Sequence, residues 1–165
     1  MVRSVKRLEG AGEWHIFKSL LPELKDKKVL DLGCGFGWHC RYVREEQASS
    51  VIGIDISAKM LEQASRLTDD SKISYMQMPI EDIDFPSAQF DVVISSLAFH
   101  YIESFEAICK KVYDTLKLGG SFIFSVEHQS LLLEMNRIGN MTKQEIVYIG
   151  QSTITSQKVY EKHHS

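Results

Sequence analysis

This chain of 165 residues has few cysteines, no long apolar run and no large excess of charge of either sign. Its three cysteines, Cys34, Cys40 and Cys109, are odd in number and widely spaced, which argues against a disulfide framework. No C-x-x-C pair indicates a structural zinc site, and we expect no metal. Buried, reduced thiols are what this cysteine usage predicts.

The lack of a long apolar stretch and of excess positive charge also disfavours membrane and nucleic-acid functions. No apolar stretch approaches the roughly 18 residues that span a bilayer, so we expect no membrane segment. The basic N-terminus has no apolar region after it, as a signal peptide would, and we expect a cytoplasmic protein. Nineteen Lys and Arg residues against 22 Asp and Glu residues leave a net charge of -3, so we expect no nucleic-acid partner.

What the sequence does contain is an alternation of short β-rich runs with amphipathic stretches, which predicts a parallel sheet covered by helices. Hydrophobic residues make up 44% of the chain, enough for the core of a single domain over residues 1–165. The predicted strands cover residues 29–32, 51–55, 73–76, 90–95 and 121–126. The predicted helices run from Trp38 to about Gln47, onward from an N-cap at Ser57, and from Phe105 to Gly119–Gly120.

Gly33, Gly35 and Gly37 follow the first predicted strand, at a strand-to-helix turn. Glycines at such a turn let the backbone bend sharply and approach a ligand without Cβ clashes. Asp55, at the end of the second predicted strand, can bind both hydroxyls of a ribose. Together these residues indicate the adenosine half of a nucleotide site, and an ordinary tight turn is the alternative for the glycines.

The details of the loop narrow the choice of nucleotide. Trp38 stands where the dinucleotide fingerprint G-x-G-x-x-G has its third glycine, which disfavours an NAD-dependent oxidoreductase. No Walker lysine follows the glycines, which disfavours ATP and GTP. Asp31, directly before the loop, would repel a pyrophosphate and attract an ammonium and a sulfonium. The electrostatics therefore favour a cationic adenosyl cofactor.

Three segments together resemble the motifs of class I S-adenosylmethionine-dependent methyltransferases: VLDLGCGFGW from Val29, VIGIDIS from Val51 and FDVVISS from Phe90. EDIDFP, from Glu81, is similar to a segment that precedes the fourth strand in the small-molecule type. The resemblance runs from about residue 13 to residue 128. It implies S-adenosyl-L-methionine as cofactor and a Rossmann-like α/β fold: an open, mostly parallel sheet with helices on both faces and strand order 3-2-1-4-5.

The resemblance also implies roles for individual residues. The implied cofactor-binding residues are Asp31, Gly33, Gly35 and Gly37 at the methionine moiety, Asp55 at the ribose, Ile56, Glu81 and Asp82 at the adenine, and Ser96 and Leu97 at the methionine ammonium. Pro79 stands where the family often has an acid, so adenine recognition falls on residues 80–82. The alternative for these acidic residues is a solvated loop.

The catalytic residue we expect is His100, which follows the fourth predicted strand. Methyl transfer is an in-line displacement in which positioning supplies much of the rate, and a base is needed only where the acceptor must lose a proton. His100 would serve as that base or orient the acceptor, and a polar residue that caps the strand is the alternative. Tyr101, Glu127 and His128 are further candidates for the acceptor pocket, and Trp14 is either a lid over the cofactor or a core anchor.

We expect the protein to transfer the methyl group of S-adenosylmethionine to a small-molecule nucleophile. The alternative is a shortened relative that binds the cofactor, or only keeps the fold, and acts through a partner. We divide the chain into an N-terminal helical segment (1–28), a cofactor-binding core (29–128) and an irregular or hairpin tail (129–165).

The tail is the reason for the alternative, because its pattern does not match the two closing strands that family members usually have. We therefore expect strands 6 and 7 to be missing. Residues 121–126 would then form an exposed apolar edge, which invites pairing with another strand. We predict either a homodimer through this edge or a hairpin of residues 145–149 and 153–160 that covers it.

Overall fold

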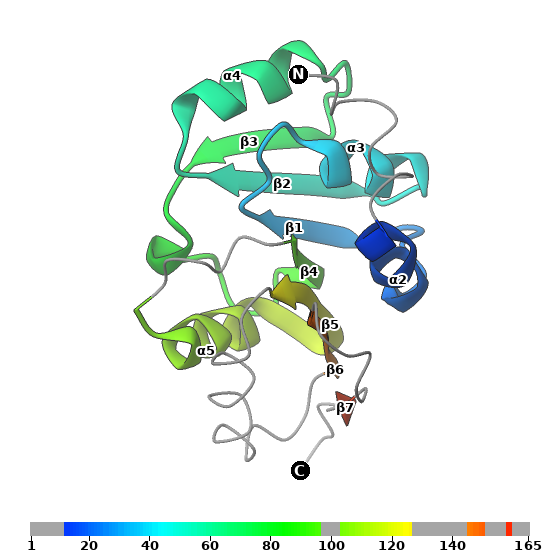
Figure 1. The fold of residues 1–165 in the computed structure, drawn as a ribbon, viewed down its shortest axis with the longest axis vertical. Coiled ribbons are helices and arrows are strands. Elements are labelled where there is room, and N and C mark those ends of the chain that lie inside the picture. Colours follow the sequence, from blue (N-terminus) through cyan, green and yellow to red (C-terminus); the bar gives the residue numbers. More distant parts are fainter. Residues whose placement is uncertain (1–11, 97–102, 127–144, 151–157, 160–165) are drawn as a thin grey trace.

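A computed structural model of the chain describes residues 12–96, 103–126, 145–150 and 158–159 (Figure 1). The strands are β1 (Lys28–Leu32), β2 (Ser50–Asp55), β3 (Ile73–Gln77), β4 (Phe90–Ser96), β5 (Leu116–Val126), β6 (Glu145–Gly150) and β7 (Lys158–Val159). The helices are α2 (Gly12–Leu20), α3 (Trp38–Glu45), α4 (Ala58–Arg66), α5 (Phe105–Thr115) and the short 3-10 helix η1 (Ile80–Asp82).

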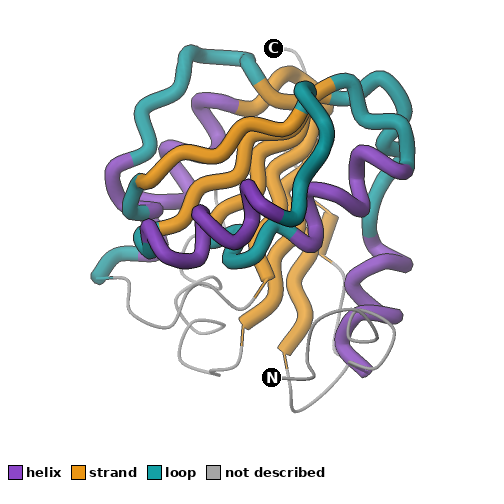
Figure 2. The backbone as a smooth tube through the Cα atoms, turned by 90° about the horizontal axis from the view of Figure 1, so that it is seen from above, coloured by secondary structure: helices purple, strands orange, loops and turns teal. Residues whose placement is uncertain are grey.

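All seven strands belong to one sheet, in the order β3-β2-β1-β4-β5-β6-β7. The pairs β1–β2, β1–β4, β2–β3 and β4–β5 are parallel, which confirms the predicted order 3-2-1-4-5. Because parallel neighbours need crossover connections, the helices between them lie over the sheet, and Figure 2 shows them on both of its faces. The carboxyl ends of β1, β2 and β4 therefore meet at one edge, where ligands bind in open α/β sheets.

The expectation that two further strands are missing is wrong. β6 pairs with β5 in parallel, from Ser121 opposite Glu145 to Val126 opposite Gly150, and β7 pairs with β6 antiparallel. Covering a strand edge requires only extended backbone with N–H and C=O groups to share, so no family motif is needed in the covering segment. Of our two predictions for this edge, coverage by the tail is the one observed: β6 occupies the edge of residues 121–126, and residues 151–157 of the predicted hairpin lie outside the described residues.

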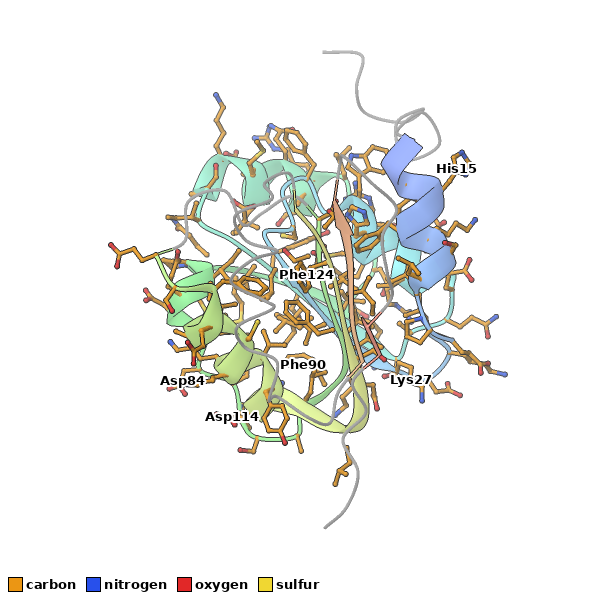
Figure 3. The ribbon with its side chains drawn as sticks, turned by 60° about the horizontal axis from the view of Figure 1, so that its bottom comes forward. His15, Lys27, Asp84, Phe90, Asp114 and Phe124 are labelled. Atoms are coloured by element: carbon orange, nitrogen blue, oxygen red, sulfur yellow. The ribbon has the colours of Figure 1, made fainter. Side chains whose placement is uncertain are left out.

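Buried side chains form two hydrophobic clusters because successive residues of a strand point to opposite faces of the sheet. Val29 packs in one cluster with Phe17 of α2 and Val43 of α3. Leu30 packs in the other with Ile108 of α5. Figure 3 shows the second cluster through Phe90 and Phe124, which lie inside the molecule, whereas His15 and Asp84 lie at its surface.

The predicted end of one helix needs correction. Helix α5 ends at Thr115, before Gly119–Gly120, because Leu116 is fully buried and pairs with Phe90 as the first residue of β5. On α4, Leu61 is buried and Met60 is exposed, as is Leu67 at the C-cap of the helix. The predicted N-cap is confirmed, since the Ser57 hydroxyl oxygen accepts the N–H of Met60 at 3.2 Å.

Candidate functional site

The loop between β1 and α3 is a tight turn that requires its glycines. Gly33, Gly35 and Gly37 have φ angles of 72°, 52° and 78°, in the left-handed region that favours glycine. The N–H of Cys34 donates to the Ile54 carbonyl at 2.8 Å, which ties the loop to the end of β2. A Cβ on Gly35 would meet no atom within 4 Å, so the space outward of this glycine is open.

Asp55 connects the end of β2 to this loop. One of its carboxylate oxygens accepts the N–H of Gly35 at 2.9 Å, and the other accepts the N–H of Ser57 at 2.8 Å. A carboxylate has about four lone-pair positions, so these two bonds leave capacity for further donors. The acid and the glycine loop, which the sequence singled out separately, therefore form one unit at the carboxyl edge.

Asp31 is buried below the loop, with only 1% of its surface exposed. Its Oδ2 accepts the Cys40 thiol at 3.3 Å. Burial raises the pKa of the Asp31 carboxyl from 3.8 to about 7; the thiol hydrogen bond lowers it, and the nearby Asp55 raises it. Below about pH 7 the Asp31 carboxyl therefore holds its proton.

Cys34 and Cys40 lie together beneath the loop, and both are buried thiols that form no disulfide; Cys109 is buried as well. The hydrogen bond to the Cys34 thiol, followed by burial and the charge of Asp31, raises the pKa of Cys40. Gly53 makes room for the pair, because a Cβ there would lie 2.8 Å from the Cys40 sulfur and 2.9 Å from the Cys34 sulfur. Sequence reasoning missed Gly53, although a glycine inside a strand signals a close approach.

Ile56 and η1 lie on the side of the site expected to hold adenine. Ile56, directly after Asp55, is 68% exposed, so its apolar side chain is accessible to a ligand. The Met78 N–H donates to the Asp55 carbonyl at 3.0 Å, which links the segment before η1 to the same strand end. In η1, Glu81 and Asp82 are exposed, and the Lys111 ammonium on α5 donates to the Glu81 carbonyl.

Trp14 is a core anchor and not a lid. It is 6% exposed, and its ring lies 4.8 Å from the Tyr42 ring and 5.3 Å from the His39 ring. Burial lowers the pKa of His39 to about 4, so this imidazole stays neutral between the rings of Trp14 and Phe17. The aromatic group therefore attaches α2 to α3.

Several expected site residues lie outside the described residues: Leu97, His100, Tyr101, Glu127 and His128. Ser96 is the last residue of β4 and is half-buried. The described part of the site thus unites the glycine loop, Asp31, Asp55 and Ile56, while the catalytic residue stays a prediction.

Comparison with known proteins agrees with this geometry. Residues 30–124 match the family model described as Methyltransferase domain. The crystal structure of a candidate S-adenosylmethionine dependent methyltransferase from Listeria monocytogenes is similar, with a TM-score of 0.70 and 57% sequence identity. That match covers 72% of this chain and 56% of the other.

Two curated relatives show how the substrates of similar proteins differ. A malonyl-(acyl-carrier protein) O-methyltransferase from Enterobacter lignolyticus is 36% identical, over 71% of this chain and 45% of its own length. A tRNA U34 carboxymethyltransferase from Saccharophagus degradans is 31% identical, over 70% of this chain and 39% of its own length. The chain thus spans less than half the length of these relatives.

Proposed function

This chain belongs to the methyltransferase-domain family and has the class I fold of S-adenosylmethionine-dependent methyltransferases, and on that premise we propose that it binds S-adenosylmethionine and transfers the methyl group to a small-molecule nucleophile. One observation carries the proposal. The Gly35 N–H donates to Asp55 at 2.9 Å, while the space outward of Gly35 is open. A backbone that presents left-handed glycines beside a carboxylate fits an adenosyl group.

The described residues offer complementary groups to each part of this cofactor. Asp55 has the remaining acceptor capacity for the ribose hydroxyls, and the exposed Ile56 would pack on the adenine. In its ionised form, Asp31 would balance the charge of the methionine ammonium near the loop of Gly33, Gly35 and Gly37. S-adenosylmethionine, when bound, supplies a methyl carbon that its sulfonium activates.

The remaining polar contacts come from two further segments. Glu81 and Asp82 would recognise the adenine from η1, a turn that the Lys111 bond to the Glu81 carbonyl connects to α5. The backbone carbonyls of Ser96 and Leu97 would accept the methionine ammonium after β4. His100 follows them in the chain and would orient the acceptor or remove its proton.

We propose a small molecule as the acceptor because the chain has a net charge of -3 and no long basic run, which a tRNA-binding surface would need. The buried Cys34 and Cys40 thiols, which form no disulfide, support a reducing compartment such as the cytoplasm. Methyl transfer from labelled S-adenosylmethionine, tested with small-molecule, acyl-carrier-protein and tRNA substrates, separates the acceptor classes. Label that accumulates only on a macromolecule would contradict this choice.

Calorimetric titration with S-adenosylhomocysteine tests the site itself. We expect binding by the wild-type chain and an affinity at least tenfold weaker in Asp55→Asn, which loses a charged acceptor. The matched control is Asp91→Asn at the opposite edge of the sheet, where the carboxylate accepts the Lys28 N–H at 2.9 Å and lies 3.3 Å from the Lys117 ammonium. Equal affinity in all three proteins would contradict the proposed site.

The titration together with the methyl-transfer assay tests the non-catalytic alternative. Cofactor binding without turnover on any acceptor class would support a binding role exerted through a partner. Turnover that is lost in His100→Gln, with cofactor affinity retained, would support catalysis and the role proposed for His100.

A further inference from the structure

A hydrogen-bond network supports the glycine loop from the side of α3. The Arg41 guanidinium, through Nη1, donates to the Phe36 carbonyl at 2.7 Å, and its central carbon lies 5.0 Å from the centre of the Trp38 ring. The same nitrogen donates to the Thr68 hydroxyl oxygen at 3.3 Å. Arg41 thus joins the loop to the segment between α4 and β3, which lies beside α3 in Figure 1.

Thr68 is the centre of this network, and its single hydroxyl proton determines the direction of each bond. Its hydroxyl donates to the Ala64 carbonyl at 2.7 Å. The Tyr75 hydroxyl lies 2.7 Å from the same oxygen, and it must be the donor because the Thr68 proton is already used. The Thr68 oxygen therefore accepts from both Arg41 and Tyr75 and holds these two side chains in place.

Tyr75, from β3, occupies the space beside Gly37 where a side chain would stand. A Cβ on Gly37 would lie 2.9 Å from the ring carbon Cζ of Tyr75, closer still to the tyrosine hydroxyl, and 3.0 Å from Arg41 Nη1. The backbone of Gly37 is thus seated against two members of the network. Because the contacts come from α3, from the α4–β3 segment and from β3, they join three separate elements at one turn of the loop.

We propose that Arg41, Thr68 and Tyr75 are positioning residues for the cofactor, and that they act by holding the Phe36–Gly37 turn in the shape that leaves the space at Gly35 open. None of the three has to contact the ligand. A loop that already has its bound shape loses less conformational freedom on binding, so the network raises affinity. This inference rests on the proposed function, since it assigns the loop to cofactor binding.

Arg44 provides a matched control, because it lies on the same helix and bonds to the same α4–β3 segment without contacting the loop. Its Nε donates to Asp70 at 2.8 Å, and its guanidinium also donates to the Ala48 carbonyl. Removing either arginine should cost the protein stability. Only the removal of Arg41 should also weaken cofactor binding.

The test compares S-adenosylhomocysteine affinity by calorimetry with the melting temperature for each variant. We expect a Kd about tenfold higher for Arg41→Gln, because a charge-assisted hydrogen bond to the loop is lost. Arg41→Lys, which keeps the positive charge, should restore part of the lost affinity. Thr68→Val and Tyr75→Phe should each raise the Kd about threefold. Arg44→Gln should lower the melting temperature but leave the Kd within about twofold of the wild-type value.

Equal affinities in Arg41→Gln, Arg44→Gln and the wild-type chain would overturn the positioning role while leaving the proposed function intact. A similar loss of affinity in both arginine variants would also overturn it, since the effect would then follow general stability. If the wild-type chain binds no S-adenosylhomocysteine, the proposed function fails and this inference fails with it. If Arg41→Gln does not fold, Thr68→Val takes its place in the same comparison of Kd and melting temperature, because valine keeps the shape of the threonine side chain.

Discussion

Tyr75 approaches Gly37 so closely that its ring carbon Cζ lies 2.9 Å from the point where a Cβ of Gly37 would stand. Gly35, two residues earlier in the same loop, has no atom within 4 Å of the corresponding point. Two glycines of one motif are thus required for different reasons. Gly37 makes room for a neighbouring strand, whereas Gly35 keeps a space open in front of the loop.

This difference predicts opposite effects of two alanine substitutions. Gly37→Ala should lower the free energy of unfolding by about 2–4 kcal/mol, because the new methyl group collides with Tyr75 at a φ of 78°. Gly35→Ala should cost only about 1 kcal/mol from left-handed strain, but weaken S-adenosylhomocysteine binding at least tenfold. Urea unfolding and calorimetry measure the two effects. Equal stability losses in the two variants would contradict the explanation.

The raised pKa of Asp31 predicts a pH-dependent stability. The unfolded chain releases the Asp31 proton near pH 3.8, whereas burial holds it in the folded protein up to about pH 7. Because the folded state binds more protons between these values, the Asp31 contribution to the free energy of unfolding falls as pH rises through this window. Asp31→Asn does not titrate, so it should gain stability relative to wild type from pH 4 to pH 8, by up to about 4 kcal/mol.

Urea unfolding of Asp31→Asn and wild type at a series of pH values measures this difference. Comparing the two proteins at each pH removes the titration of the other groups that they share. A stability difference that stays constant over this range would show that Asp31 ionises alike in the folded and unfolded chains.

The thiol pair beneath the loop predicts non-additive substitutions. Gly53→Ala should destabilise the fold by about 2–3 kcal/mol, because its methyl group would lie within 2.9 Å of the sulfurs of Cys34 and Cys40. Cys40→Ala removes one of these sulfurs. The double variant should therefore lose less stability than the two single variants combined, as measured by urea unfolding. Strict additivity would mean that the alanine methyl group is accommodated elsewhere.

The packing of Trp14 predicts a loss of stability without a loss of cofactor affinity. Trp14→Ala should lower the free energy of unfolding by about 3–5 kcal/mol, because Trp14 packs against Phe17, Tyr42 and His39. Trp14→Phe keeps an aromatic ring and should lose less. Calorimetry of Trp14→Phe with S-adenosylhomocysteine should give the wild-type affinity. Weaker binding at unchanged stability would restore the interpretation of Trp14 as a lid.

Features that depend on neighbours in the chain could be predicted from the sequence. The strand spacing, the glycines and the acid at the end of β2 all follow from local rules, and the structure bears out the strand order 3-2-1-4-5. Ser57 is an N-cap for the same reason, since its hydroxyl serves an N–H only three residues away. The burial of the three cysteines also agrees with their number and spacing in the sequence.

Features that depend on which distant segments pack together could not be predicted. The pairing of β6 with β5 requires only available backbone groups, and helix α5 ends early because Leu116 is buried against the sheet.

The sequence by itself therefore determined the five-strand core, its family and the residues expected to bind a cofactor, because strand periodicity and motif spacing are local properties. Only the tertiary structure decided what surrounds the glycine loop: Arg41, Thr68 and Tyr75 on one side, and Gly53 with its two thiols below. These residues come from elements far apart in the chain. Their contacts exist only once the packing of α3, α4 and β3 sets the distances between them.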